Sequence, residues 1–302
     1  MSKHILLTGA TGMLGKDLIK NLLDRGDQVS ILSRKPQRIN GVKVFLWDVY
    51  QQQIDSNCLD GVDCIVHLAG ENISEGKWTE KRKKAIIDSR VLSAQLLFKT
   101  IAENKNQVKD FISAAAVGIY GDRGDEVLTE ESSPGKDFMA TCCEQWEAAA
   151  NKGLALGLRV VKIRTGVVFS KDSGALPAMA KPVQFFAGAP LGTGKQYIPW
   201  IHHQDMTQVY LHLIDQKQLS GVYNACAPLP VSNKTLTKAI AKQLHRPVWP
   251  FNVPASVLKL ILGEMSAVVI NSNNASAQKL LNTGFIFSYT KVEDALSDIY
   301  GR

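Results

Sequence analysis

The chain of 302 residues lacks a long, uninterrupted apolar segment. Its most apolar late stretch, "VPASVLKLILGEMSAVVI" (253–270), is broken by Lys259 and Glu264. Because a membrane-spanning helix needs about 20 consecutive apolar residues, we expect a buried or amphipathic helix here and no membrane association. The opening "MSKHILLTG" has no signal-peptide pattern, which favours a cytoplasmic protein.

The cysteines lack the spacing of a zinc site or of a disulfide framework. There are five, an odd number, and Cys142 and Cys143 are adjacent, so on a helix they point about 100° apart and would not chelate one metal together. We therefore expect reduced thiols and no metal site.

The sequence also lacks a strong basic run. Thirty-five Lys and Arg against 28 Asp and Glu give a net charge of +7, but the densest cluster, "KWTEKRKK" (77–84), is short and contains a glutamate and only one aromatic residue. This is a poor match to a nucleic-acid surface. The excess charge is either a solvated surface or a bias toward anionic ligands such as nucleotides.

What the sequence does contain is an alternation of strands and helices. Apolar, strand-like runs separated by segments of helical periodicity predict a parallel sheet covered on both faces, that is, an α/β fold with a doubly wound sheet of the Rossmann type. The expected strands are 4–9, 28–33, 42–48, 63–70, 110–116 and 159–166, and the main helices are 13–26, 79–104 and 137–156.

The pattern changes after residue 167. Residues 170–200 are rich in Gly and Pro, and helices are expected near 233–244, 254–263, 274–282 and 291–300. We expect a first domain over 1–167, to which the segment around 200–230 returns. A smaller domain, mainly 168–302, is expected to cover the carboxyl edge of the sheet.

The most specific motif is "TGATGMLG" (8–15), between the first strand and the first helix. Gly9 permits a tight turn, Gly12 lets the backbone approach a diphosphate, and Gly15 lets the helix pack close to the strand. The helix N-terminus then offers free N–H groups to the phosphates. The motif predicts dinucleotide binding, with Thr11, Met13 and Leu14 in the same loop.

The residues after the second strand indicate which dinucleotide binds. An NAD site usually has an acid here, whereas this sequence has Ser33, Arg34 and Lys35, which suit a 2′-phosphate and favour NADP(H). Asp48 ends the third strand and is expected to meet the adenine edge. The small residues of "LAG", Leu68, Ala69 and Gly70, let the backbone run beside the cofactor.

Several segments together resemble the extended short-chain dehydrogenases/reductases, and more narrowly the atypical epimerase family of the bacterial YfcH type. They are "GATGMLG", "LAGENI" (68–73), "KWTEKRKKAIIDSR" (77–90), "SAAAVGIYG" (113–121), "RTGVVFS" (164–170), "GTGKQYIPWIHHQD" (192–205) and "LLNTGFIFSY" (280–289). The resemblance runs nearly from end to end. It implies NADP(H) binding and a substrate-side domain, but it gives no defined substrate.

Ordinary members of that group use a serine, and a tyrosine followed four residues later by a lysine that lowers the pKa of the tyrosine for proton transfer. The serine position falls at Ala115 or Ala116, and the other two fall at Met139 and Cys143. None of the four residues supplies the usual chemistry. The classical pair is therefore absent.

Other residues are candidates for the site. Tyr120, His202 and Cys143 are candidate proton donors, each with a structural role as its alternative. Asp137 and Asp205 are expected to cap helices. The resemblance places Arg90 at the phosphate or ribose side of the cofactor. Glu71 is expected near the nicotinamide ribose or the substrate, and Arg164, Thr165 and Gly166 at the nicotinamide end.

We therefore expect an NADP(H)-binding atypical oxidoreductase or epimerase-like enzyme. It would act on a carbonyl, an alcohol or a nucleotide-sugar, a small-molecule substrate that the sequence does not identify. The alternative is a non-catalytic NADP(H)-sensing or protein-interaction module. The sequence leaves open whether the chain forms a homodimer.

Overall fold

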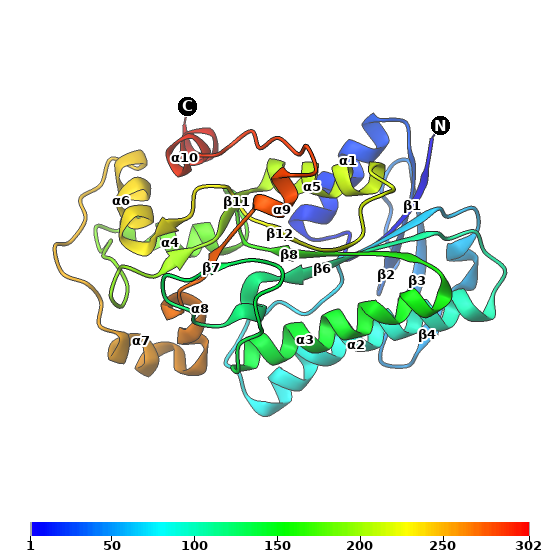
Figure 1. Ribbon diagram of the computed structural model, residues 1–302, viewed down its shortest axis with the longest axis horizontal. Coiled ribbons are helices and arrows are strands. Elements are labelled where there is room, and N and C mark those ends of the chain that lie inside the picture. The colour runs from blue at the N-terminus through cyan, green and yellow to red at the C-terminus, as the bar shows by residue number, and fades with distance from the viewer. Residues whose placement is uncertain (1, 302) are drawn as a thin grey trace.

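The computed structural model describes residues 2–301 and is built around one large sheet (Figure 1). Its eight strands are parallel except for the last, short one, which pairs antiparallel with its neighbour. In spatial order they are β12 (Gly221–Ala225), β8 (Arg159–Thr165), β6 (Asp110–Ala116), β5 (Cys64–His67), β1 (His4–Thr8), β2 (Gln28–Ser33), β3 (Val42–Asp48) and β4 (Gln53–Ile54). The order reverses between β1 and β5, as expected for a doubly wound sheet.

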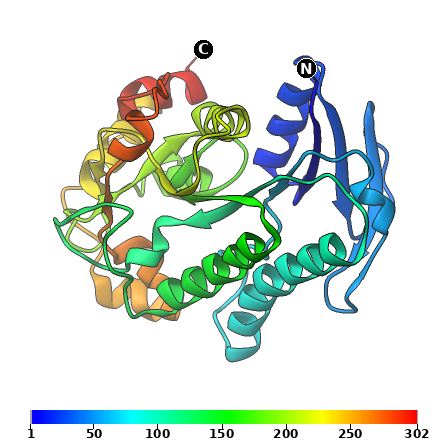
Figure 2. The ribbon, with the colours of Figure 1, turned by 45° about the vertical axis from the view of Figure 1, so that its right-hand side comes forward.

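Helices cover both faces of this sheet, which confirms the predicted fold class. The long helices α2 (Glu80–Glu103) and α3 (Phe138–Asn151) lie side by side on one face (Figure 2). Helices α1 (Met13–Asp24) and α5 (His203–Asp215) pack together on the other. Strand residues such as Ile5 and Leu6 are completely buried, because successive side chains enter the two opposite cores.

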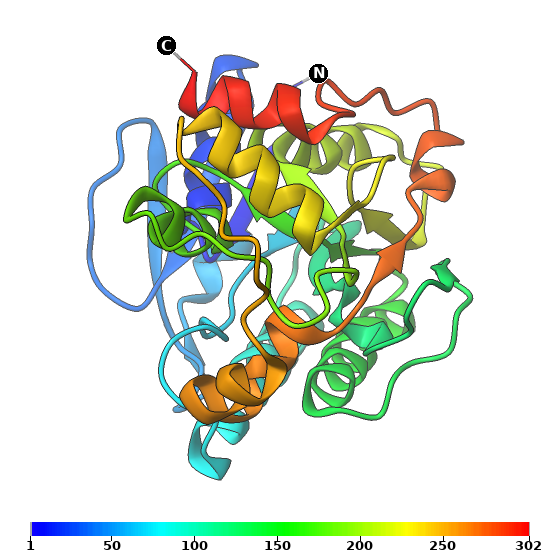
Figure 3. The same ribbon diagram turned by 90° about the vertical axis from the view of Figure 1, so that its left-hand side faces the viewer.

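The chain returns to the sheet late in the sequence through α5 and β12. Several of the other later elements form a third core beside the carboxyl edge of the sheet, in which α6 and α10 lie side by side (Figure 3). They are β9 (Val167–Phe169), α4 (Ala175–Gln184), β10 (Tyr197–Ile198), β11 (Trp200–His202), β13 (Val231–Ser232), α6 (Asn233–Gln243) and α10 (Val292–Tyr300). The other four are α7 (Ala255–Leu262), α8 (Ala267–Ile270), β14 (Asn274–Ala275) and α9 (Gln278–Leu281), of which β14 and α9 pack into a core of the large sheet. The strand β7 (Val127–Leu128) pairs with β14.

Four short 3₁₀ segments join these elements in residues 2–301: η1 (Ser56–Leu59), η2 (Val117–Tyr120), η3 (Lys152–Leu156) and η4 (Gly263–Ser266). The last of them, η4, connects the later elements to α2. Lys83 of α2 lies 2.6 Å from Glu264 of η4, and Met265 packs against the cluster that contains Trp78.

Three predicted elements differ from the structure. The expected helix 137–156 is α-helical only to Asn151 and ends as η3, which closes on Gly157 in the left-handed region (φ 74°). The expected helix 274–282 begins only at Gln278, because residues 274–275 pair with β7. The helix expected near 254–263 is present as α7, but the apolar stretch 253–270 is not one helix, because it is broken at Gly263 (φ 59°).

Asp205 was also assigned wrongly as a helix cap. The Nδ1 of His202 accepts the first backbone N–H at the start of α5, from Gln204. Asp205 lies in the first turn of the helix, and its carboxylate accepts the backbone N–H groups of Ser288 (2.8 Å) and Tyr289 (3.0 Å). Its role is therefore to hold the chain that leads to α10.

Candidate dinucleotide site at the carboxyl edge of the sheet

Two glycines of the loop between β1 and α1 and of the start of α1 lie too close to the neighbouring backbone to carry a side chain. Gly9 has φ 68°, and a Cβ added there would lie 2.7 Å from the carbonyl carbon of Leu68. A Cβ on Gly15 would lie 2.6 Å from the Cα of Ala10. Gly12 begins α1 without a side-chain cap, and the first turn contains no acidic residue. The start of α1 therefore fits a diphosphate, which its free N–H groups and its dipole favour.

The buried hydroxyl of Thr8 fixes the loop after β5, which contacts the glycine loop. Thr8 Oγ1 accepts hydrogen bonds from the backbone N–H groups of Leu68 and Ala69, each at 3.1 Å, and lies 2.8 Å from His67 Nδ1. His67 Nε2 is in turn 3.1 Å from Ser93 Oγ on α2. Burial, and then the positive charge of Arg90, lower the pKa of His67 to about 3, so this histidine is neutral. The sequence analysis missed Thr8 and His67, although both stand next to the predicted loops.

A cleft of about 1350 Å³ opens between these loops and the ends of β2 and β3. Many of its lining residues were predicted as cofactor contacts. These are Gly9, Thr11, Gly12, Ser33, Arg34, Lys35, Asp48, Leu68, Ala69, Gly70 and Glu71. Trp47, Val49 and Tyr50 beside Asp48, and Ser89 of α2, also line the cleft and were not predicted. Asp48 shapes this wall, because its Oδ1 accepts the N–H groups of Tyr50 and Gln51, each at 2.9 Å.

The end of β2 presents positive charge to the cleft. Ser33 Oγ accepts the N–H of Lys35 (3.2 Å) and donates to its carbonyl (2.7 Å), which fixes the turn. The side chain of Arg34 is 76% exposed, and its Nη1 lies 3.6 Å from Glu71 Oε1. Glu71 is held more closely by Arg82 of α2, at 2.9 Å. The two guanidinium groups outweigh the single carboxylate, so an anion at this corner is favoured.

The other predicted contacts lie outside this cleft. Met13 and Leu14 are already in the first turn of α1, and Gly15 serves the packing described above. Gly166 is required where β8 leads into β9, because a Cβ there would lie 2.2 Å from the carbonyl oxygen of Pro199. Thr165 Oγ1 donates to the carbonyl of Ile163 within the same strand, at 3.3 Å.

The α3 positions of the usual catalytic pair are filled by sulfur-containing side chains. Asp137 caps this helix as predicted, accepting the N–H of Ala140 at 2.8 Å. One turn on, Met139 Cε occupies the space beside Gly118, only 2.7 Å from where a Cβ would stand. Cys143 Sγ lies 3.8 Å from the same point, and burial raises the pKa of its thiol. This environment favours a packing role for Cys143 over the predicted role as an acid–base group.

Tyr120 is also bound internally. It is completely buried, donates to Asn224 Oδ1 at 2.7 Å and accepts from Arg164 Nη1 at 2.9 Å. Burial raises the pKa of Tyr120 to about 12. The remaining Arg164 nitrogens donate to Glu147, at 2.7 and 3.1 Å. This geometry favours structural roles for Tyr120 and Arg164 over the predicted roles in proton transfer and cofactor contact.

His202 lies in the junction between the sheet and the later elements. It is completely buried, its ring stacks 3.9 Å from that of Tyr289, and its Nδ1 accepts the N–H of Gln204. Its Nε2 lies 3.2 Å from Asp298 Oδ2 on α10, without hydrogen-bond geometry. Burial, reinforced by His203, lowers the pKa of His202 to about 4. An enclosed ring at this junction favours a structural role for His202 over the predicted role as a proton donor.

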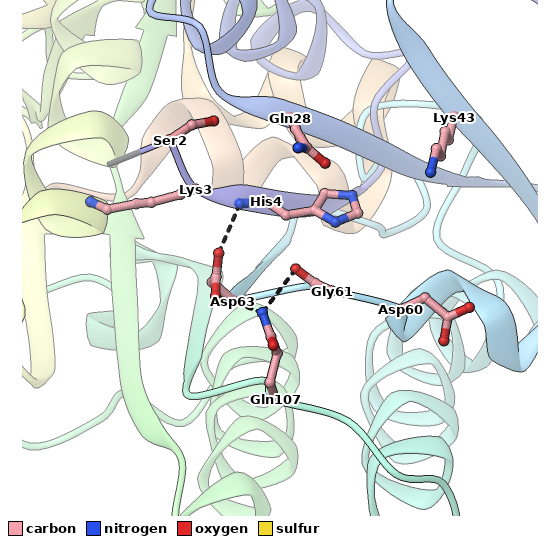
Figure 4. Close-up of a pocket in the computed structure, with 9 residues that line it drawn as sticks. All are labelled: Ser2, Lys3, His4, Gln28, Lys43, Asp60, Gly61, Asp63 and Gln107. Atoms are coloured by element: carbon pink, nitrogen blue, oxygen red, sulfur yellow. Dashed lines mark hydrogen bonds between the residues drawn. The ribbon is translucent and has the colours of Figure 1, made fainter.

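A second, smaller pocket of about 410 Å³ lies at the opposite edge of the sheet (Figure 4). There Asp63 accepts the backbone N–H of His4 at 2.9 Å and a side-chain N–H of Gln107 at 3.0 Å. These hydrogen bonds tie together the amino ends of strands, so the pocket is separate from the glycine loop. Residues 2–301 contain no cluster of His, Cys, Asp and Glu suited to a metal, and no helix long and apolar enough to cross a membrane. The five cysteines are free and buried.

Comparisons with known proteins agree with this architecture. The sequence pattern of the NAD dependent epimerase/dehydratase family matches residues 5–226, and that of a domain of unknown function, DUF1731, matches residues 253–299. Epimerase family protein YfhF of Bacillus subtilis (strain 168) is 36% identical over 302 residues, which is 98% of this chain and 97% of that protein.

Two solved structures are similar over the whole chain. One is human epimerase family protein SDR39U1 (isoform2) with NADPH, with a TM-score of 0.86 and 27% identity, covering 98% of this chain and 99% of that one. The other is a nucleoside-diphosphate sugar epimerase from Corynebacterium glutamicum, with a TM-score of 0.82 and 36% identity. The match covers 100% of this chain and 59% of the Corynebacterium chain.

Proposed function

The chain belongs to the NAD dependent epimerase/dehydratase family, and we propose that it is an NADP(H)-binding, atypical oxidoreductase or epimerase-like enzyme. The observation that carries this proposal is the cleft of about 1350 Å³, walled by the glycine loop and by the basic end of β2. The NADPH bound to the similar human protein supports the same cofactor here.

We assign the parts of the cofactor to different elements around the cleft. The diphosphate would bind at the N-terminus of α1, where Gly12 leaves the backbone open. The adenosine would lie between the ends of β2 and β3, against Asp48 and Trp47. When bound, the nicotinamide supplies or accepts a hydride at a carbonyl or alcohol carbon of the substrate.

Selectivity for NADP(H) over NAD(H) would come mainly from Arg34. Its guanidinium is mobile enough to turn toward a 2′-phosphate, since it is mostly exposed and is held only by a 3.6 Å ion pair with Glu71. Glu71 is the acid that contacts Arg34, and Arg82 neutralises it. A phosphate therefore gains a cation without meeting an unpaired carboxylate.

The proton that accompanies hydride transfer would come from water. Tyr120 is hydrogen-bonded on both sides of its hydroxyl, Cys143 is a buried thiol, and His202 faces α10. None of them is free to exchange a proton with a substrate at the cleft. Water is therefore the proton donor that we propose, because this chain lacks the tyrosine–lysine pair.

The same absence supports a second candidate function, a protein that binds NADP(H) as a sensor without turnover. Met139 and Cys143 fill the space beside Gly118 with apolar side chains where the family usually has reactive ones. The two functions share the cofactor site and differ only in whether the bound cofactor is consumed.

The test has two steps. In the first, NADPH and NADH are titrated by nicotinamide fluorescence into the wild type, Arg34→Gln and the control Arg38→Gln, an exposed arginine outside the cleft lining. Because a charge-assisted hydrogen bond contributes about 1.5–3 kcal/mol, Arg34→Gln should weaken NADPH binding about 10- to 100-fold and leave NADH binding unchanged. Equal losses for both cofactors would refute the 2′-phosphate assignment.

In the second step, NADPH oxidation by the wild type is followed against a panel of carbonyl compounds and nucleotide-sugars. Substrate-dependent oxidation supports the enzyme. Tight NADPH binding without turnover supports the sensor. No binding of either cofactor overturns both.

A further inference from the structure

Helix α7 is apolar, yet most of its surface is exposed. Its sequence, ASVLKLIL, contains one charged residue, Lys259, and Leu258 is its only buried residue. Leu260 is 87% exposed and Ile261 is 66% exposed. A helix that is apolar on most sides is normally buried in protein or in lipid. An exposed apolar surface of this kind marks a site of association.

Aromatic side chains extend this surface beyond α7. The chain that leads into α7 carries Trp249 and Phe251, which are 55% and 74% exposed, and the exposed Phe185 and Phe186 follow α4. The two segments are joined, because the indole N–H of Trp249 donates to the carbonyl of Phe186 at 2.7 Å. Phe186 has φ 61°, which is uncommon for a bulky residue. The exposed ring is therefore held at the expense of backbone strain, as is found at functional sites.

These segments lie at one end of the molecule. In Figure 1, α4, α6 and α7 are at the end opposite to β2 and β3, and Figure 3 looks directly onto them. We call this surface the apolar end. Its exposed side chains are Phe185, Phe186, Trp249, Phe251, Leu260 and Ile261.

The excess positive charge of the chain is concentrated in the same segments. Residues 173–204 and 218–263 contain seven Lys and Arg and no Asp or Glu, and +7 is the net charge of the whole chain. The seven are Lys181, Lys195, Lys234, Lys238, Lys242, Arg246 and Lys259. The acidic residues of α10 lie beyond α6, on the side away from α7 (Figure 1).

Contacts and spacing place several of these cations next to the apolar end. The three lysines of α6 recur every four residues and so form one exposed stripe, opposite its buried face. The guanidinium carbon of Arg246 lies 4.7 Å from the centre of the Phe186 ring, and Lys259 is on α7 itself. The apolar end is therefore bordered by cations.

This combination fits an anionic lipid surface better than other partners. Side chains as exposed as Leu260 and Phe251 protrude, whereas a docked peptide needs a groove. A second copy of this face would bring like charges together. Nucleic acid would use the cations and the aromatic rings but would leave the aliphatic side chains of α7 without a partner. A bilayer accepts apolar side chains about 5–10 Å deep at its headgroup boundary, where neighbouring cations meet the lipid phosphates.

We propose that the apolar end is a docking surface for an anionic phospholipid bilayer, a property that goes beyond cofactor binding. Phe251, Leu260 and Ile261 enter the headgroup boundary, and the bordering cations remain at the level of the phosphates. The expectation of no membrane association rested on the lack of a spanning segment, which a peripheral contact does not need.

Trp249 is a natural reporter of this contact. The chain has five tryptophans, and the other four are at most 8% exposed. Tryptophan emission is recorded while vesicles are added, made either of phosphatidylglycerol and phosphatidylcholine in equal parts or of phosphatidylcholine alone. The emission should shift to shorter wavelength with the anionic vesicles only. Trp249→Phe should remove most of this shift while the protein still sediments with the vesicles.

Co-sedimentation with the same vesicles measures the affinity of the variants. Leu260→Ser with Ile261→Ser should weaken binding at least about 10-fold, because two apolar side chains no longer leave water. Arg246→Gln with Lys259→Gln should weaken it about 30-fold, which is about 5-fold for each charge.

Two variants elsewhere on the surface are matched controls. Ile286→Ser removes an apolar side chain that is 85% exposed, and Lys99→Gln removes an exposed cation of α2. Both should bind the vesicles like the wild type. Because every substituted side chain is exposed, the melting temperatures should stay unchanged, which separates a loss of docking from a loss of the fold.

Several results would overturn the proposal. Wild-type protein that binds anionic vesicles no better than neutral ones has no such docking surface. Unchanged binding of Leu260→Ser with Ile261→Ser would reduce the contact to adsorption by charge. A dimer in sedimentation velocity that this double variant dissociates would assign the apolar end to a second copy. A single-stranded oligonucleotide or polyglutamate that binds as tightly as the anionic vesicles would assign it to another polyanion.

Discussion

Breaking the buried ion pair beneath the site by removing one partner should destabilise the fold strongly. Glu147 of α3 is 7% exposed and accepts two hydrogen bonds from Arg164 of β8, at 2.7 and 3.1 Å. Lys162 Nζ lies 3.7 Å from the same carboxylate. Burial lowers the pKa of Lys162, as expected for a cation held in the interior. Glu147→Gln keeps the shape of the side chain but leaves two neighbouring cations without their counter-charge.

The expected cost follows from what is left behind. Removing one partner of a buried pair typically costs about 3–5 kcal/mol, because the other charge stays buried. At about 2–4 °C per kcal/mol for a protein approaching this size, the melting temperature should fall by roughly 6–20 °C. Glu126→Gln breaks the more exposed pair with Arg123 (2.6 Å) and should cost less than about 1 kcal/mol.

The assay is urea unfolding followed by both tryptophan fluorescence and far-ultraviolet circular dichroism, since coincident transitions justify comparing free energies of unfolding. The double variant Glu147→Gln with Arg164→Met should recover part of the loss, because it removes one of the two stranded cations. A Glu147→Gln protein within about 1 kcal/mol of wild type would refute the reasoning. So would a double variant that is less stable than the single one.

Two further predictions concern the loops of the cleft. The pKa of His67 is about 3 in the folded chain and about 6.5 in the unfolded chain. Between these pH values the unfolded chain therefore binds one more proton than the folded chain. The free energy of unfolding should fall below about pH 6.5 by up to about 1.4 kcal/mol per pH unit. His67→Gln should remove this part of the slope when free energies of unfolding at pH 7 and pH 5 are compared; an unchanged slope would contradict the assignment. Gly9→Ala forces a Cβ to 2.7 Å from a backbone carbon, whereas Gly26→Ala has a similar φ of 80° and nothing within 4 Å. Gly26→Ala should therefore cost about 1–2 kcal/mol without affecting cofactor binding, and Gly9→Ala should cost more and abolish tight NADPH binding; equal effects would show that strain alone matters.

The features that could be predicted from the sequence are those set by neighbours along the chain. The glycine loop follows a strand and opens a helix, so its conformation is fixed by local φ angles and by the start of α1. The caps at Thr79 and Asp137 depend on N–H groups three residues away and were equally readable. The positive end of β2 was readable for the same reason, since Ser33, Arg34 and Lys35 lie within one turn.

The features that could not be predicted are made by residues far apart in sequence. Arg164 meets Glu147 and Tyr120 only because β8 lies beside β6 and under α3. Asp205 finds its partners more than 80 residues later, so its local spacing indicated a helix cap instead. The helix expected at 274–282 loses its first residues to strand pairing with β7, which no local propensity reports. The pattern around His202 likewise gave no sign that α10 would enclose the ring.

Replacing the usual catalytic pair changes the chemical character of the whole surface of α3 beside Gly118, and not only of two side chains. The missing Cβ of Gly118 lets Met139 pack tightly against η2, and Cys143 stays protonated beside it, so this stretch of α3 is apolar. An apolar wall strengthens the electrostatic effect of any charge next to it. The positive charge next to this wall is that of Arg90 on α2, whose guanidinium lies over the ring of Trp146 on α3. A tyrosine–lysine pair both moves a proton and carries positive charge, and the side chains of Met139 and Cys143 supply neither function.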